Sequence, residues 1–134
     1  MGWTTFEART KRRAHLLGIT EQVAAAVEKA RVTEGVCTVY VPHTTAGVTI
    51  NEGADPDVAR DLEKELTRLV PRDGDFAHGE GNSDSHVKTA LIGPSCSVPV
   101  RDGKLALGRW QAIFLCEWDG PRTRTIEVAV AEFR

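Results

Sequence analysis

The chain has 134 residues, enough for one hydrophobic core and too few for two, so we expect residues 1–134 to form a single domain. Hydrophobic residues make up 41% of the sequence and charged residues 27%, and the net charge of −2 predicts no binding to nucleic acid or to an anionic membrane. No apolar run approaches the roughly 20 residues that span a bilayer, and the start does not resemble a signal peptide, which together predict a cytoplasmic protein.

The first part of the chain predicts a strand, a helix and a second strand. Residues 3–9 alternate loosely and predict the first strand, and the basic cluster Lys11–Arg13 that follows is typical of a solvated turn. Thr20 is a suitable N-cap for an alanine-rich helix that ends near Gly35. Residues 36–41 form a β-branched run, which favours a strand.

Residues 43–52 alternate between polar and apolar side chains, which predicts a strand with two different faces. The apolar face consists of Ala46, Val48 and Ile50. The face with hydrogen-bonding groups consists of His43, Thr45, Thr49 and Asn51. This polar face fits the wall of a binding site, and it equally fits a strand whose outer side meets water.

The sequence Asp55-Pro56-Asp57 predicts the start of a second helix, with a carboxylate cap and a proline at the first helical position. Apolar residues then recur on one face, and the other face carries charges that we expect to be solvated. The apolar positions are Val58, Leu62, Leu66 and Leu69.

Polar groups are dense from residue 77 to residue 93, and this stretch is the predicted floor of an active site. Ser83 can cap a short third helix that has Asp84 in its first turn and ends at Gly93. The residues of this helix that we expect to face inward are Val87, Ala90 and Leu91.

The remainder of the chain predicts strands joined by turns. Residues 97–101 and 104–107 flank Asp102-Gly103, a strong hairpin signal, and residues 109–118 are apolar on both faces, as in a central strand. Residues 122–133 alternate, and the arginines Arg122 and Arg124 fall on the apolar side. Such arginines need an anion or a carboxylate as partner, which points to a phosphate site or a subunit interface. The order of elements predicts an α+β fold, a mostly antiparallel sheet or sandwich with two longer helices and one short helix packed on it.

Three cysteines, Cys37, Cys96 and Cys116, are far apart and odd in number. This predicts neither a disulfide framework nor a thiolate metal site. We expect buried, unreactive thiols.

Three histidines, His43, His78 and His86, lie in polar segments or near predicted element ends. Three imidazoles with an open fourth position are typical of a catalytic zinc site, in which Glu80 or Asn82 could orient a ligand or a water. The spacing also fits a metal-free site that binds phosphate or moves protons, and it fits three unrelated surface histidines.

Six spaced segments carry a further signal: PHTTAGVTINE (42–52), DPDV (55–58), HGEGN (78–82) with His86, DGKL (102–105), LGRWQ (107–111) and EWDGPR (117–122). Taken together, these segments resemble one family, the YjbQ family of secondary thiamine-phosphate synthase enzymes. The resemblance implies a compact α+β homotrimer with a histidine site that holds a metal ion or an anion. It also implies a weak thiamine-phosphate synthase activity, which joins a hydroxymethylpyrimidine diphosphate to a thiazole phosphate and releases pyrophosphate.

The resulting hypothesis assigns a role to eleven residues. The ligands of a divalent metal, with zinc expected, are His43, His78 and His86. The residues that surround the phosphates of a small phosphorylated substrate are Thr44, Thr45, Asn82, Lys88 and Arg122. The candidates for proton transfer or for support of the ligands are Glu52, Glu80 and Asp84. Two alternatives are a metal-dependent hydrolase of a phosphorylated metabolite and a non-catalytic trimer that binds an anion or effector.

Overall fold

A computed structural model describes residues 2–134 of the chain. Its elements, in chain order, are β1 (Gly2–Arg9), β2 (His15–Gly18), α1 (Thr20–Ala30), β3 (Gly35–Tyr40), β4 (Ala46–Glu52), α2 (Pro56–Leu69), α3 (Ser83–Ile92), β5 (Ser95–Arg101), β6 (Lys104–Leu105), β7 (Gln111–Glu117) and β8 (Thr123–Glu132).

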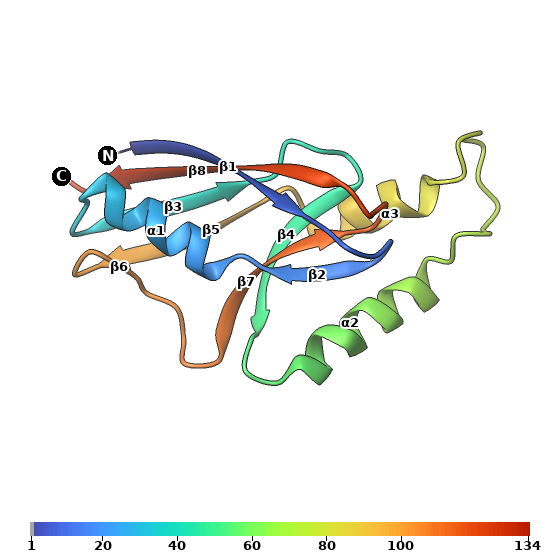
Figure 1. Cartoon of the computed structure of the whole chain (residues 1–134), viewed down its shortest axis with the longest axis horizontal. Coiled ribbons are helices and arrows are strands. Elements are labelled where there is room, and N and C mark those ends of the chain that lie inside the picture. The colour runs from blue at the N-terminus through green and yellow to red at the C-terminus, as the bar shows by residue number, and fades with distance from the viewer. Residues whose placement is uncertain (1) are drawn as a thin grey trace.

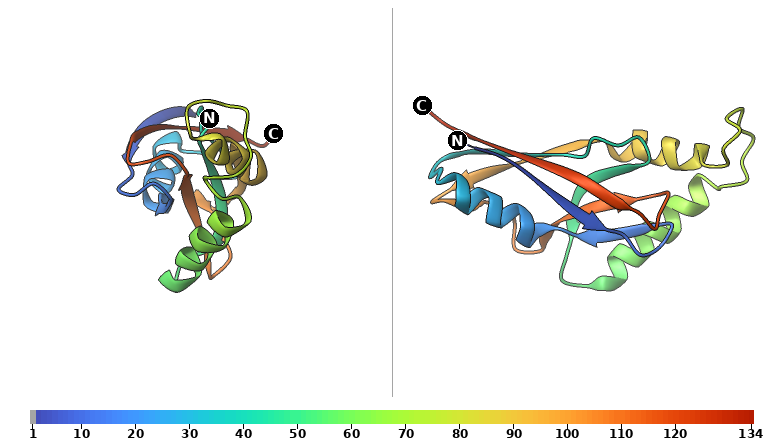
Figure 2. Two further views of the ribbon diagram at one scale, coloured as in Figure 1. Left: turned by 90° about the vertical axis from the view of Figure 1, so that its right-hand side faces the viewer. Right: turned by 45° about the horizontal axis from the view of Figure 1, so that its top comes forward.

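The strands form two antiparallel sheets, which confirms the predicted α+β class. One sheet has five strands in the order β1-β8-β3-β5-β6, and the other has three strands in the order β2-β7-β4. Figures 1 and 2 show an elongated molecule with both termini near one end and α3 at the other. Residues that meet near α3 therefore lie far from the termini in space.

The main core lies between the two sheets and includes one face of α1. Helix α1 buries Val23, Ala26 and Val27, whose spacing puts them on one helical face. Strand β8 alternates between core and surface, as expected for residues 122–133, and its buried apolar residues are Ile126, Val128 and Val130. The same core receives the side chains of β3 that were expected to share one face, Cys37 and Val39.

Strand β7 is the middle strand of the three-stranded sheet and is covered on both faces, which confirms its prediction as a central strand. Ile113 and Leu115 face the main core. Phe114, Cys116 and Trp118 face a second cluster, where they meet side chains of α2. Because Glu117 follows this alternation, its carboxylate points between the two sheets, where it is fully buried.

The hairpin and the second helix form where the sequence predicts them. Asp102 and Gly103 have φ angles of 50° and 76°, the left-handed conformation of a two-residue turn between β5 and β6. Asp55 caps α2, since its carboxylate accepts a hydrogen bond from the Asp57 N–H at 2.9 Å. The apolar face of α2 is only half covered, and Leu69 at its end is 59% exposed. Among residues 2–134, no helix combines the length and the apolar character needed to cross a membrane.

Three local predictions need correction, and one strand was missed. Thr20 is not a cap: Ile19 holds that position, and the Thr20 hydroxyl accepts a hydrogen bond from the Ile113 N–H at 2.8 Å. Helix α1 ends at Ala30 rather than near residue 35, because Arg31 adopts a left-handed conformation. Strand β4 begins at residue 46, so residues 43–45 lie in the loop before it and not on its polar face. The short strand β2 was not predicted.

The three cysteines are free, as predicted. Cys37 and Cys116 are buried and Cys96 is half-buried. Burial raises the pKa of Cys116 to about 12 and the pKa values of Cys37 and Cys96 to about 11. All three are therefore thiols at neutral pH, and thiols are poor nucleophiles.

Candidate anion-binding site

A polar pocket of about 410 Å³ lies at the α3 end of the molecule. It is formed by three segments that are far apart in sequence, the β3–β4 loop, the residues around the start of α3, and the turn that leads from β7 into β8. Its lining residues are Pro42, His43, Thr44, Thr45, Glu80, Asn82, His86, Asp119, Arg122 and Arg124. The pocket thus brings together most of the predicted site residues.

The sheet register explains why the first and the last of these segments meet. Strands β3 and β8 are antiparallel, and Tyr40 at the end of β3 pairs with Glu127. The chain that continues from β3 therefore runs alongside the first residues of β8. This places His43 next to Thr125 and places Thr45 next to Arg124.

A buried ion pair forms the floor of the pocket. The Arg124 Nε donates to Glu117 Oε1 at 2.8 Å, and its Nη2 donates to the other carboxylate oxygen and to the Thr45 hydroxyl, the latter at 2.8 Å. The Thr10 hydroxyl also donates to Glu117, at 2.8 Å. Arg124 is 4% exposed and Glu117 is fully buried. The prediction that an arginine on the apolar side needs a partner is confirmed, and the partner is a carboxylate of the same chain.

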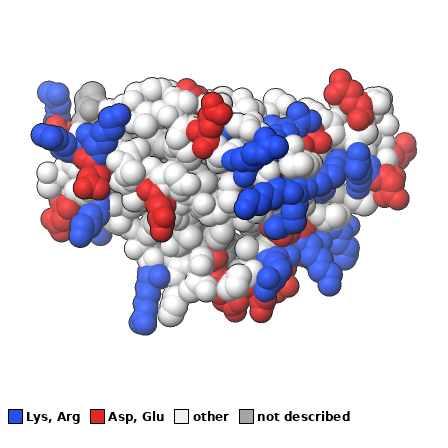
Figure 3. All heavy atoms as spheres, in the orientation of Figure 1, with Lys and Arg blue, Asp and Glu red and all other residues white. Residues whose placement is uncertain are grey.

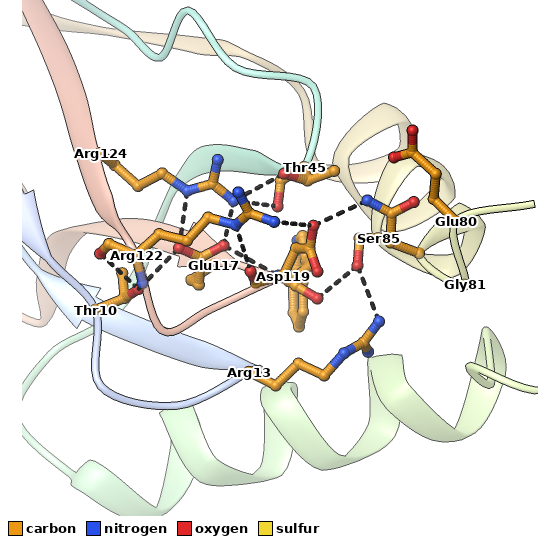
Figure 4. A network of polar contacts seen from close by, with 12 residues as sticks. Thr10, Arg13, Thr45, Glu80, Gly81, Ser85, Glu117, Asp119, Arg122 and Arg124 are labelled. Atoms are coloured by element: carbon orange, nitrogen blue, oxygen red, sulfur yellow. Dashed lines mark hydrogen bonds and ion pairs between the residues drawn. The ribbon is translucent and has the colours of Figure 1, made fainter.

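A second, more exposed ion pair lies in the turn between β7 and β8 and connects this turn with the start of α3. Arg122 donates from Nη2 to Asp119 Oδ2 and from Nε to the Asp119 carbonyl, at 2.9 and 2.7 Å. The Asn82 amide also donates to Asp119 Oδ2, at 2.9 Å (Figure 4). Asp119 therefore holds one side chain from each of the two segments that it joins.

His43 is fixed by the backbone of β8. Its Nε2 accepts a hydrogen bond from the Thr125 N–H at 3.0 Å. Burial, and after it the positive charge of Arg124, lowers the pKa of His43 below its usual value. A neutral imidazole with an acceptor at Nε2 carries its proton at Nδ1, so His43 is a hydrogen-bond donor on the pocket wall.

Several donors in the pocket have no hydrogen-bond partner among residues 2–134. These are Nδ1 of His43, the hydroxyl of Thr44, and Nη1 of both Arg122 and Arg124. Unpaired donors that line one hollow suit an anion with several oxygen atoms. Phosphate and diphosphate groups have this chemistry.

His78 and His86 lie close together at the rim, with ring centroids 5.5 Å apart in an edge-on arrangement. His78 is outside the pocket lining, and its Nε2 is 3.6 Å from the exposed carboxylate of Glu80. Within residues 2–134, no three side chains of His, Cys, Asp or Glu are arranged to hold a metal ion. Nε2 of His43 is occupied by a backbone N–H, so His43 would have to give up this hydrogen bond to join His78 and His86 around a metal ion.

Three other predicted residues also lie outside the pocket. Glu52 is at the opposite end of β4, where it accepts backbone N–H bonds from Ala54 and Asp55 at 2.7 and 3.3 Å. Asp84 and Lys88 form a buried ion pair of 2.8 Å beneath α3. Burial alone would raise the pKa of Asp84, but hydrogen bonds from Arg13 and Lys88 outweigh it and lower the pKa to about 2. This carboxylate therefore has no proton to donate at neutral pH.

Helix α3 faces the opposite way from its prediction. Its buried residues are Asp84, Ser85, Lys88 and Thr89. Val87, Ala90 and Leu91, which were expected inside, are all exposed, Val87 by 39% and Leu91 by 63%. Ser83 is the first helical residue and not the cap, because Asn82 occupies the cap position. The buried face carries the ion pairs of Asp84 with Arg13 and Lys88, which the pattern of apolar residues does not indicate.

Sequence reasoning missed Asp119 and Glu117 and left Arg124 out of the proposed site. The sequence contains a signal for both acids. Glu117 interrupts the apolar run of β7, and Asp119 directly follows that run at a turn. A buried arginine two residues into the next strand is the partner that such an acid requires.

The surface around this end of the molecule is rich in basic side chains. Figure 3 shows Lys and Arg gathered on the right half of the visible face, over the end where α3 and the β1–β2 turn lie. The net charge of the whole chain is −2, so this clustering is local. A local positive field favours the approach of an anion.

A model of the protein family described as UPF0047 protein YjbQ-like matches residues 4–132. The chain belongs to the YjbQ family. Members with similar sequences include the UPF0047 protein MJ1081 of Methanocaldococcus jannaschii, 45% identical over 93% of this chain and 91% of that protein. The YugU protein of Bacillus subtilis is 43% identical over 90% of this chain and 92% of its own length.

Crystal structures of YjbQ-family proteins agree with the fold. A family member from Clostridium acetobutylicum has a TM-score of 0.94 at 43% identity and covers 96% of this chain and 99% of that one. A hypothetical protein from Aeropyrum pernix also has a TM-score of 0.94, at 35% identity, over 99% of this chain and all of its own. The resemblance first seen in the spaced motifs is thus confirmed at the level of family and fold.

Proposed function

We propose that the pocket binds the phosphate groups of a small phosphorylated substrate and that the protein has the weak thiamine-phosphate synthase activity implied by its family resemblance. The observation that carries this proposal is the convergence of unpaired donors from His43, Arg122 and Arg124 on one polar hollow. His43 and Arg122 are residues that the sequence had already assigned to metal or phosphate binding.

The synthase reaction makes a specific demand on such a pocket. The carbon–oxygen bond of the hydroxymethylpyrimidine diphosphate breaks, its electron pair leaves on the pyrophosphate, and the thiazole nitrogen forms a new bond to the same carbon. No proton transfer is needed for the bond exchange itself. Negative charge that builds on the departing oxygen is stabilised best by donors already in place, and Arg124 is held in place by Glu117.

A non-catalytic anion-binding protein is the second candidate. It is favoured over a hydrolase, which must activate water, by the state of the carboxylates, because Glu117 and Asp119 are both paired with arginine and Glu80 lies exposed at the rim. No carboxylate among the lining residues 42–124 is therefore both unpaired and buried, as a strong general base would be.

The divalent metal and the homotrimer stay proposals. His78 and His86 are the pair that could share an ion with a phosphate oxygen, and such an ion would add positive charge beside the leaving group. A trimer would give the outward apolar side chains of α3 a partner, since Val87 and Leu91 are 39% and 63% exposed.

The test is an assay with the two phosphorylated substrates of the synthase, followed by separation of the products. We expect thiamine phosphate and pyrophosphate in equal amounts, and a loss of both in Arg122→Met. Release of inorganic phosphate without the thiazole partner would instead indicate the hydrolase. Tight binding of pyrophosphate without any turnover would indicate the non-catalytic protein and overturn the proposed activity.

A further inference from the structure

We infer that Arg13 is a positioning residue for the anion pocket, which it holds in shape through a buried ion cluster with Asp84 and Lys88. The inference rests on the proposed anion site and adds a residue that lies outside the lining. Arg13 belongs to the basic cluster after β1 that was expected to be a solvated turn.

The side chain of Arg13 is bound to the first turn of α3. Its Nη1 and Nη2 donate to the two carboxylate oxygens of Asp84 at 3.0 and 3.1 Å, a two-pronged contact that fixes direction as well as distance. Nη2 also reaches the Ser85 hydroxyl at 3.5 Å. Asp84 is fully buried, so these contacts are shielded from water (Figure 4 shows Arg13 reaching toward Ser85).

The inner face of α3 completes the cluster. Lys88 Nζ donates to Asp84 Oδ2 at 2.8 Å and lies 5.7 Å from the centre of the Trp118 ring. The Ser85 hydroxyl donates to the Trp118 carbonyl at 2.6 Å. The start of α3 is therefore attached to the end of β7 and to the β1–β2 turn by polar contacts.

The backbone of Arg13 is bound to the pocket on a second side. Its carbonyl accepts a hydrogen bond from the Gly120 N–H at 3.1 Å. Gly120 directly follows Asp119, which binds both Asn82 and Arg122. One residue thus joins the turn that carries Asp119 to the helix that carries Asn82 and His86.

The two ends of α3 are held by different means. At its C-terminal end, the Gly93 carbonyl accepts a hydrogen bond from Val48 N–H at 3.2 Å, and β4 passes so close that a Cβ on Gly47 would lie 2.5 Å from that carbonyl oxygen. At its N-terminal end, the polar cluster of Arg13 takes the place of apolar packing, because Val87 points outward. Loss of the Arg13 side chain should therefore release the end that carries Asn82 and His86.

The experiment compares Arg13→Met with Arg12→Met, which removes the neighbouring charge from an exposed pair with Glu63. Calorimetric titration with sodium pyrophosphate gives the affinity of each purified full-length variant. We expect the affinity to fall about tenfold in Arg13→Met, since displacement of binding groups by a fraction of an ångström is enough for such a loss. In Arg12→Met it should stay within about twofold of the wild type.

Two further variants separate positioning from general loss of stability. Val130→Ala weakens the main core far from the pocket, and it should lower the melting temperature without lowering the affinity. Arg13→Lys keeps the charge, so it should recover part of the affinity lost in Arg13→Met. If Arg13→Met does not fold, a normal affinity in folded Arg13→Lys would overturn the inference, because a lysine cannot form the two-pronged contact.

A readout without ligand keeps the inference separate from the proposed function. The side-chain NMR signals of Asn82 and His86 should shift or broaden in Arg13→Met and not in Arg12→Met. Absence of pyrophosphate binding in the wild type would overturn the proposed function alone. Unchanged signals of Asn82 and His86 in Arg13→Met, or an unchanged affinity, would overturn the positioning role.

Discussion

The Nε2 atom of His43 accepts a hydrogen bond from the backbone N–H of Thr125 at 3.0 Å. This contact leaves Nδ1 as the proton-bearing nitrogen and makes the ring a donor toward the pocket. It also gives His43 a backbone partner, whereas His78 and His86, with which the sequence had grouped it, lie with their ring centroids 5.5 Å apart. The roles of the three histidines can therefore be distinguished by mutation.

His43→Ala should weaken pyrophosphate binding about tenfold, because one hydrogen bond to a charged group is lost. His78→Ala is the matched control, since His78 lies outside the lining, and its affinity should stay within about threefold of the wild type. Titration calorimetry on protein purified without a chelator measures both. Equal losses in the two variants would favour the three-histidine metal site over the present account.

The pH dependence of stability follows from two histidines. Burial lowers the pKa of His43, aided by Arg124, and burial lowers that of His15, aided by Arg12. Below about pH 6.5 the two histidines bind protons in the unfolded chain more readily than in the folded protein. The free energy of unfolding should therefore fall as the pH drops. Urea unfolding between about pH 5 and about pH 8 measures this slope.

His43→Gln and His15→Gln should each flatten that slope, because the unfolded state of each variant has one fewer site to protonate. A glutamine at position 43 still offers an oxygen to the Thr125 N–H. A slope that is unchanged in both variants would show that these imidazoles are protonated in the folded protein as readily as in the unfolded chain.

The close approach of α3 to β4 predicts a stability difference between two glycines. In Gly47→Ala the new Cβ would lie 2.5 Å from the Gly93 carbonyl oxygen, so the backbone must shift at a cost of about 1–3 kcal/mol. Gly18→Ala in β2 has no atom within 4 Å of the new Cβ, and its stability should change by less than about 1 kcal/mol. Chemical denaturation gives both values. A loss in Gly18→Ala as large as that in Gly47→Ala would contradict the contact.

The alternating strands could be predicted from the sequence because the signal is local. The two-sided apolar run of β7 and the regular alternation of β8 each gave the correct faces. The need of Arg124 for a carboxylate was also visible, since a buried charge without a partner is unstable. That the partner is Glu117 could be seen only in the folded structure, because the arrangement of the strands decides which side chains meet.

The direction of α3 could not be predicted for a related reason. Its apolar residues favoured one face, whereas the opposite face is buried by contacts with Arg13 and Trp118, which lie 71 and 33 residues away from their partners Asp84 and Ser85. Glu52 was assigned to the site through its motif, yet it lies at the end of β4 that is far from His43. Sequence proximity in a motif does not give proximity in space along an extended strand.

The outward apolar side of α3 predicts an interface in the proposed trimer. Leu91→Glu should reduce the mass of the assembly in solution, because it introduces a charge where we expect apolar contact. Ala25→Glu, on the exposed side of α1, is the control and should leave the mass unchanged. Light scattering after size-exclusion chromatography measures both. A wild-type protein of single-chain mass would end the trimer proposal, and a Leu91→Glu protein of wild-type mass would place the interface elsewhere.

The central claim is that the donors around His43, Arg122 and Arg124 form an anion site, and titration with pyrophosphate tests it most directly. The wild type should bind one pyrophosphate per chain, and Arg122→Met should bind it about tenfold more weakly. Arg101→Met, which removes an exposed arginine on β5, should bind like the wild type. Absence of saturable binding in the wild type, or equal affinity in Arg122→Met, would contradict the account.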